Sequence, residues 1–182
     1  MIENLGKGAS TRARLLDVAE RLFLAHGYDA VSVRTINAGA GMNPAAVNYH
    51  FGTKEDLVAA LLEDRLGPLP GAPGEGLEVE AIVALAVDPL VTLAATDERG
   101  RLHVRLLSRT IREGWPVHFA SDAFSLDRWA DAVAAAVPEL PRPVVGDRWR
   151  LAVGMILDVV GRVDVDRDVL VRFLVGGLTV PQ

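Results

Sequence analysis

Residues 40–57 read Ala-Gly-Met-Asn-Pro-Ala-Ala-Val-Asn-Tyr-His-Phe-Gly-Thr-Lys-Glu-Asp-Leu, and this stretch decides the fold. Asn43 is a strong helix N-cap, and Pro44 loses nothing at a first helical position, where no N–H is required. A very short helix is therefore predicted over 44–50, and another short helix over 32–40 comes just before it. Two short helices joined by so tight a turn cannot lie antiparallel and must cross steeply, which is the helix-turn-helix arrangement.

The segments on either side of this stretch carry matching helix signals. Residues 11–26 place apolar side chains at intervals of three and four, which predicts an amphipathic helix that stops at Gly27. Thr53 is followed three residues later by Asp56, the pattern that caps a fourth helix. Gly39 is the weak point, because glycine inside a helix costs about 1 kcal/mol relative to alanine. We therefore expect tertiary packing to compensate at Gly39.

The fourth helix is expected to end near residue 66, where a loop rich in proline and glycine begins. We place a domain boundary in this loop, 67–76, between a head of residues 8–66 and a body of residues 77–182. No segment shows the period of two that is typical of strands, so the fold class is all-α: an N-terminal three-helix helix-turn-helix head joined to a larger helical body. Helical patterns in the body cover 77–95, where Asp88-Pro89 should kink or split the helix, and 98–113, 122–137, 146–163 and 166–177.

Composition narrows the class of protein. The chain has 182 residues, half of them apolar, and no cysteine, which excludes disulfides and thiolate metal sites. The net charge is −5, but residues 1–54 carry six basic and four acidic side chains, so a modestly positive end precedes an acidic body. The start is not a signal peptide, and the longest apolar tract, 79–95, is interrupted and too short to cross a bilayer. We expect a soluble, cytoplasmic protein without a membrane partner.

The sequence offers no constellation for catalysis. The four histidines (26, 50, 103 and 118) lack metal-ligand spacing, and no Ser/His/Asp order or paired-carboxylate context stands out. The acidic run at 164–168 faintly suggests a calcium loop, but Val169 stands where the required glycine should be. A solvated helix start explains this run. We therefore expect no enzyme, no catalytic residue, no cofactor and no metal.

Three stretches together resemble the head of the TetR (tetracycline-repressor) family of transcriptional regulators: 11–28, 32–36 and 40–57. In that family a helix ending in Gly-Tyr precedes a helix-turn-helix that closes on Tyr-His-Phe, a small residue and Ser/Thr-Lys-Glu. The resemblance covers roughly residues 8–66. It implies a homodimer that binds a palindromic double-stranded DNA operator and usually responds to a small-molecule effector. Pro44 and Asn48 depart from the commonest pattern, which puts one phosphate contact and the operator preference in doubt.

Residues of the helix-turn-helix are assigned to DNA by the face they should occupy. Val47 and Phe51 are four apart and should point inward, which leaves the polar and small side chains of the third helix for base edges and phosphates. Asn48 could pair with adenine, whereas Tyr49 could instead pack and Asn43 is a cap first. The expected DNA-contacting residues are Ser32, Arg34, Thr35, Asn43, Ala45, Ala46, Asn48, Tyr49, His50 and Lys54.

The body is expected to hold the dimer interface and an effector pocket. Apolar residues at 149, 152, 156, 160 and 163, followed by those of the last segment, suggest dimerisation through about 146–178, although they could be plain monomer core. The pocket should lie within 77–137, with leucine, valine and alanine walls that favour an apolar ligand. Its expected residues are His103, Arg109, Trp115, His118, Phe119 and Trp129.

Three functions remain open at this point. The first is a repressor that a small, apolar effector releases from its operator. The second is a DNA-binding regulator without any effector, and a closed cavity among the helices of 77–137 would separate these two. The third, from another class, is a body that acts as an enzyme or a protein-partner module behind a vestigial head.

Overall fold

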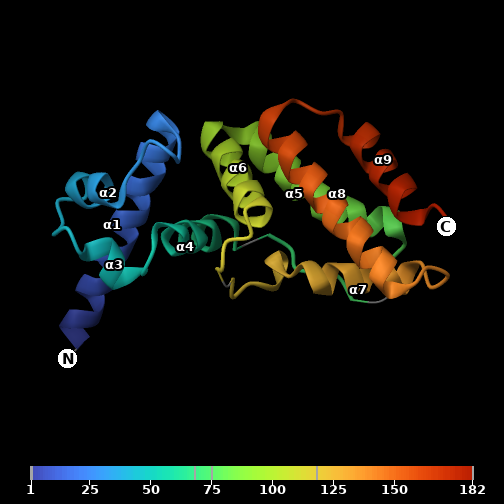
Figure 1. The fold of residues 1–182 in the computed structure, drawn as a ribbon, viewed down its shortest axis with the longest axis horizontal. Helices are drawn as coiled ribbons and strands as arrows, with labels where there is room; N and C mark the ends of the chain where they lie inside the picture. The colour runs from blue at the N-terminus through green and yellow to red at the C-terminus, as the bar shows by residue number, and fades with distance from the viewer. Residues whose placement is uncertain (1, 68, 75, 118, 182) are drawn as a thin grey trace.

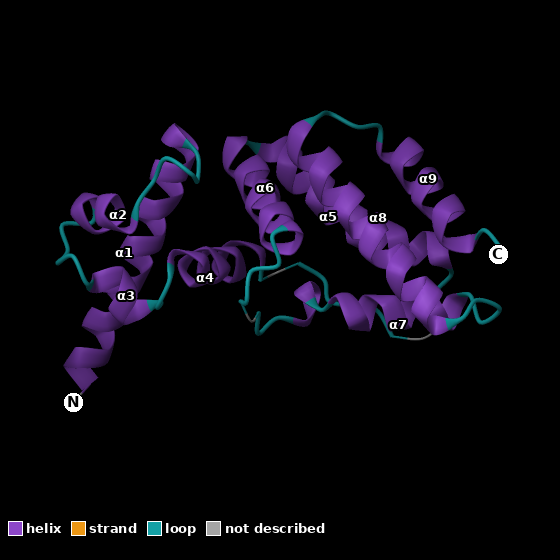
Figure 2. Ribbon diagram, viewed as in Figure 1, coloured by secondary structure: helices purple, strands orange, loops and turns teal. Residues whose placement is uncertain are grey.

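The computed structural model describes residues 2–67, 69–74, 76–117 and 119–181, without the side chains of 2–9 and 122. Within these ranges the regular structure is helical throughout (Figure 2), which confirms the all-α class. The molecule is elongated, with α1, α2 and α3 at one end, α5 to α9 toward the other, and α4 running from the first group to the middle (Figure 1). We call the part with α1 to α4 the head and the part with α5 to α9 the body, and the domain boundary at 67–76 stays a prediction.

In the described part of the chain the head contains four helices, of which the second and the fourth begin at their predicted caps. Ser32 caps the second helix by accepting the Thr35 amide, and Thr53 and Asp56 form a reciprocal capping box at the fourth. The first helix begins well before the predicted start at 11. The bounds are α1 Ile2–His26, α2 Val33–Gly39, α3 Ala46–His50 and α4 Lys54–Leu66.

The third helix starts later than predicted. Asn43 does act as a cap, because its Oδ1 accepts the amide of Ala45 at 3.0 Å, but this bond closes a turn rather than a helix. Pro44 and Ala45 lie in that turn, and α3 begins only at Ala46. Helix α3, which occupies the place of the recognition helix in a helix-turn-helix, is consequently a little more than one turn long.

Gly39 is explained by the approach of α1 to α2. A Cβ atom at this position would lie 3.0 Å from Cγ1 of Val18 on α1, closer than side chains normally pack. Glycine is therefore the residue that lets these two helices touch. Gly41, just past the end of α2, has φ of +66°, a left-handed conformation that favours glycine.

Over the residues that the structure describes, the body packs five α-helices and one 3₁₀ turn around an apolar core. Pro89 lies inside a continuous α5, so of the two predicted effects, a kink or a split, the split does not occur. The C-terminal helix is tied at both ends: Arg167 makes two bonds to Asp88 on α5, and Arg148 of α8 donates to the carbonyl oxygens of Leu178 and Val180. The bounds are α5 Val79–Thr96, α6 Glu98–Arg112, η1 Asp122–Phe124, α7 Leu126–Ala136, α8 Arg142–Arg162 and α9 Arg167–Thr179.

Helix α5 is the one helix in the described part of the chain that is long and apolar enough to cross a membrane. In the fold it packs against α6, α8 and α9, and Val83 and Val87 are fully buried there. A core helix of a helical body can have the same length and the same apolar composition as a membrane span, which accounts for the character of α5.

The head and the body meet along α6. Glu20 on α1 and His103 on α6 are both buried, and Oε1 of Glu20 lies 2.7 Å from Nε2 of His103. Arg65 on α4 lies 3.4 Å from the other oxygen of Glu20 and 2.6 Å from Asp17. A buried carboxylate is stable only with such partners, so this cluster holds α1, α4 and α6 together.

Candidate DNA-binding surface and ligand cavity

The recognition helix divides into an inner and an outer face as predicted. Val47 is fully buried, whereas Asn48 is exposed and Tyr49 is 85% exposed, so packing does not account for Tyr49. His50 is half-buried and lies edge-on to the Tyr49 ring. Ala46 must be corrected: it is only 7% exposed because it faces the core, so it is not available for a thymine methyl group.

A buried asparagine fixes the angle between α2 and α3. Asn37 is 1% exposed, its Nδ2 donates to the Pro44 carbonyl at 2.6 Å, and its Oδ1 accepts the Val47 amide at 3.1 Å. One side chain thus satisfies polar backbone groups of the turn and of the recognition helix. Asn37 is absent from the predicted site residues, although a polar residue at an inward position of α2 is a usable signal.

The start of α2 presents the other predicted contacts. Ser32, the N-cap of α2, and Arg34 and Thr35 in its first turn are all exposed. The Ser32 oxygen already accepts the Thr35 amide and lies 2.8 Å from the Thr35 hydroxyl. These two side chains therefore satisfy each other, and Arg34 is the member of the group best suited to reach a phosphate.

The prediction for Lys54 must also be corrected. Its Nζ donates to the Tyr28 carbonyl at 2.6 Å and lies 3.6 Å from the centre of the Tyr28 ring, so the ammonium group is used inside the head. Burial lowers the pKa of Lys54, while the nearby carboxylates of Glu55 and Asp29 act in the opposite direction. The predicted phosphate contact is replaced by a structural role.

Tyr28 is the centre of a cluster that joins the head to the body. Its hydroxyl donates to Glu55 at 2.8 Å, and burial, with this bond and the Glu55 charge, raises the tyrosine pKa. The Tyr28 ring contacts the Trp115 ring, with 5.2 Å between centroids, and the Arg109 guanidinium lies over it at 4.4 Å. Arg109 also makes a bidentate ion pair with Asp29.

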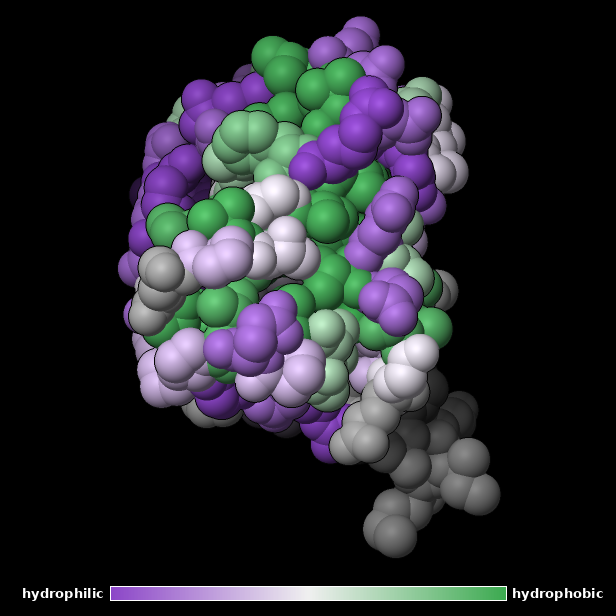
Figure 3. Space-filling model, turned by 90° about the vertical axis from the view of Figure 1, so that its right-hand side faces the viewer, coloured by the Kyte–Doolittle hydropathy of each residue, from purple (hydrophilic) through white to green (hydrophobic). Residues whose placement is uncertain are grey.

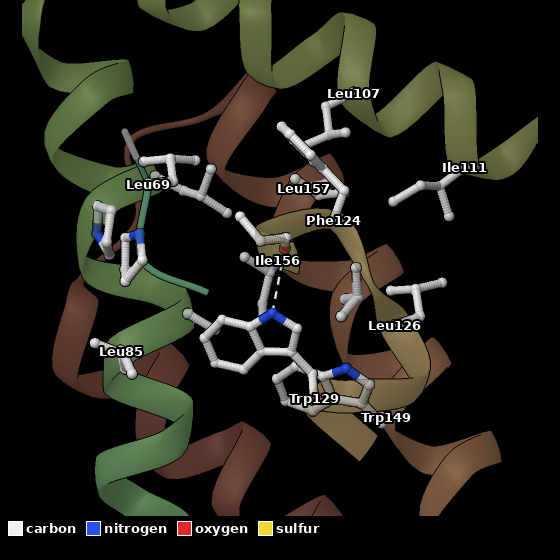
Figure 4. A pocket seen from close by; sticks show the side chains of 16 residues that line it. Leu69, Leu85, Leu107, Ile111, Phe124, Leu126, Trp129, Trp149, Ile156 and Leu157 are labelled. Atoms are coloured by element: carbon white, nitrogen blue, oxygen red, sulfur yellow. Dashed lines mark hydrogen bonds between the residues drawn. The ribbon is translucent and has the colours of Figure 1, made fainter. Parts of the chain in front are cut away.

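The body contains a cavity of about 80 Å³ with apolar walls (Figure 4). Helices α5, α6, α7 and α8 each contribute to it, together with the linker and the 3₁₀ turn. The only polar side-chain atoms among its lining residues are the two indole nitrogens. The lining residues are Leu69, Pro70, Leu85, Ala86, Pro89, Leu90, Leu107, Ile111, Ala123, Phe124, Leu126, Trp129, Trp149, Val153, Ile156 and Leu157.

Of the six residues predicted for the pocket, the structure places Trp129 in the cavity wall. His103 is bound to Glu20, and Arg109 and Trp115 surround Tyr28, so these three serve the junction between head and body instead. Phe119 stacks on Phe124, with 4.4 Å between ring centroids, behind the wall rather than in it. The sixth, His118, lies outside the described residues. The cavity also extends beyond 77–137, since the linker and α8 complete it.

An exposed apolar face covers parts of α8 and α9. Leu151 on α8 is 74% exposed and Phe173 on α9 is 63% exposed, and Met155 and Val169 are also exposed. Figure 3 views this end of the body and shows apolar residues gathered among polar ones. The α8 positions predicted for a partner, by contrast, mostly face the core of their own protomer: 149, 152, 156 and 160 are buried.

The glycines of α8 and α9 also divide into open positions and positions packed within the protomer. A Cβ atom at Gly154, Gly176 or Gly177 would have no atom of the described chain within 4 Å, so these positions are open. At Gly161 it would lie 3.1 Å from Arg105 on α6. Gly161 therefore serves packing within the protomer, while the open three would let another helix approach closely.

The fold and the exposed recognition helix define the class of this protein, a helix-turn-helix protein with a helical body. The sequence model described as "Bacterial regulatory proteins, tetR family" matches residues 15–61, the part that contains α2, α3 and most of α4. The head of the chain is thus similar to the heads of TetR-family regulators, which confirms the resemblance drawn from the sequence.

Relatives extend this match to different lengths. The transcriptional repressor AcnR of Corynebacterium glutamicum is 31% identical over 83 residues, so the match covers 46% of this chain and 44% of AcnR. The transcriptional repressor Rv1474c of Mycobacterium tuberculosis is 28% identical over 149 residues, 78% of this chain and 71% of the relative. The solved structure of Salmonella enterica GusR has a TM-score of 0.55 at 18% identity and covers 93% of this chain and 95% of that one, which shows the same fold.

Proposed function

We propose that this protein is a sequence-specific, DNA-binding transcriptional regulator that acts as a homodimeric repressor in the cytoplasm. The observation that carries the proposal is the outer face of α3, which presents Asn48 and Tyr49 while Asn37 holds the helix at a fixed angle. Arg34, on the neighbouring α2, adds a cation beside this face. Names of relatives such as AcnR and Rv1474c, both called transcriptional repressors, support the sign of the regulation.

The homodimer is proposed on the exposed apolar face of α8 and α9. A head this small spans few base pairs, so useful specificity needs two heads about 34–36 Å apart, or a multiple of that distance. Leu151, Met155 and Phe173 form an apolar surface that water solvates poorly, and a second copy of the chain would cover it by twofold symmetry.

The effector is proposed to bind in the apolar cavity of the body. An engineered cavity of about 150 Å³ admits benzene, so a cavity of this smaller size must widen to take most ligands. Two parts of its wall lie outside α-helices, Leu69-Pro70 in the linker and Ala123 in the 3₁₀ turn, and these can move without breaking a helix. A regulator without an effector remains the second candidate, favoured by the small volume.

The test is selection of bound sequences from random duplex DNA, with the mass of the complex measured in solution. A palindrome bound by two chains, or by a multiple of two, is the expected result. A non-palindromic site bound by one chain would contradict the dimer, and failure to enrich any sequence would contradict the DNA-binding function itself.

A further inference from the structure

The cavity contains one polar group that the protein does not satisfy. Trp149 is 1% exposed, and its Nε1 has no hydrogen-bond partner among the described residues. Leaving a buried N–H without an acceptor costs about 1–3 kcal/mol, and such groups are rare in folded proteins. Trp149 is therefore an exception that requires a reason.

The neighbouring tryptophan shows that the cavity can satisfy an indole. Trp129 stacks against Trp149, with 5.8 Å between ring centroids, and its Nε1 donates to the Ala123 carbonyl at 3.2 Å. Figure 4 draws this bond as a dashed line and shows the indole nitrogen of Trp149 on the side of its ring that faces the other labelled side chains. The two indoles share one environment, yet only one has an acceptor.

Water is a poor partner for the Trp149 N–H. A buried water molecule needs about two to four polar partners. The other lining side chains are apolar, and the second indole N–H is already engaged. A ligand that fills the apolar space and carries its own acceptor has no such requirement.

We propose that the ligand of this cavity is a small apolar molecule with one hydrogen-bond acceptor, of the ketone or ester class, and that Trp149 donates to its oxygen. The inference rests on the proposed function, which places the effector in this cavity. It adds the chemical feature by which the effector is chosen over a plain hydrocarbon of the same shape. Trp149 is the specificity-determining residue of the site.

Two probes of equal shape test this proposal on the full chain. Acetophenone carries a carbonyl oxygen, and α-methylstyrene replaces that oxygen with a methylene group. In a ¹⁵N–¹H spectrum of the wild-type protein, acetophenone should move the Trp149 indole resonance downfield, whereas α-methylstyrene should not. The ratio of the two affinities should shift against acetophenone by about five- to tenfold in Trp149→Phe. In the control Trp115→Phe, whose indole lies outside the cavity and donates to Glu113, the ratio should stay unchanged.

The outcomes separate the inference from the proposed function. If both probes bind, the Trp149 resonance stays in place and the affinity ratio is the same in Trp149→Phe, the acceptor requirement is wrong while the cavity remains a ligand site. If neither probe binds at millimolar concentration, the cavity is not an effector site, and the inference fails with it. The spectrum of the wild-type protein gives the answer even if Trp149→Phe does not fold.

Discussion

Asn48 is the residue on which base specificity should depend. Its side chain is exposed on the outer face of α3, and an amide can pair bidentately with adenine. Asn48→Ala should reduce discrimination between the selected operator and a version with one A·T pair changed by about tenfold, because one such pair contributes about 1–3 kcal/mol. Competition binding measures this ratio.

Asn43→Ala is the matched control for that substitution. Asn43 caps the Ala45 amide, so its loss should lower stability by about 1 kcal/mol and leave base discrimination intact. Full discrimination in Asn48→Ala would show that other residues specify the operator.

Lys54 should matter for stability and not for the phosphate backbone. Lys54→Met removes the bond from Nζ to the Tyr28 carbonyl and should lower Tm by several degrees, a loss of about 1–2 kcal/mol. Its plot of log affinity against log salt should keep the wild-type slope. Arg34→Ala is the comparison, since the exposed Arg34 should flatten that slope by about one phosphate contact. If the salt slope decreases equally in both variants, Lys54 does contact a phosphate.

For single residues, the sequence predicts the features that depend on local spacing. The caps at Ser32 and Thr53 follow from bonds between residues three apart, so the chain itself contains all the information required. The burial of Ala46 and the contact of Lys54 with Tyr28 depend on how helices pack, which local patterns do not specify.

The junction of α1, α4 and α6 should make stability depend on pH. Burial lowers the pKa of His103 below its ordinary value of 6.5, against the bond and charge of Glu20, which raise it. Arg65 and Asp97 also act on this histidine, in opposite directions. As the pH falls through 6.5 the unfolded chain takes up a proton that the folded chain does not, so the unfolded state is favoured.

The free energy of unfolding should therefore decrease from pH 7 to pH 5, by at most about 1.4 kcal/mol per pH unit from this one group. Urea denaturation at several pH values measures it. His103→Gln is expected to be less stable at neutral pH but to show a shallower dependence in this range. If His103→Gln shows the same pH dependence of stability as the wild type, other titratable groups cause that dependence.

The arrangement of elements also explains why the cavity could be predicted only in part. Of the pocket residues predicted within 77–137, Trp129 lines the cavity. The apolar spacing of α8 suggested a contact with a partner, whereas Trp149 and Ile156 face inward. A single helix shows the period of its apolar residues, but the sequence does not say whether that face meets its own protomer or another.

In the whole molecule, the exposed face of α8 and α9 should set the oligomeric state. Phe173→Asp places a charge on this face and should convert the dimer to a monomer at micromolar concentration, with operator affinity reduced at least a hundredfold because one head binds alone. Leu77→Asp is the control, an exposed apolar residue on the loop before α5. Analytical ultracentrifugation and operator titration check both variants. A dimeric Phe173→Asp would place the interface elsewhere.

The buried pair of Glu20 and His103 also limits how this protein can evolve. Recombination could join this head to the body of a relative, but the carboxylate of Glu20 would then be enclosed without the imidazole that meets it, at a cost of about 1–3 kcal/mol or more for a charged group. The two halves should therefore be inherited together, and substitutions at positions 20 and 103 should occur together among descendants of this chain.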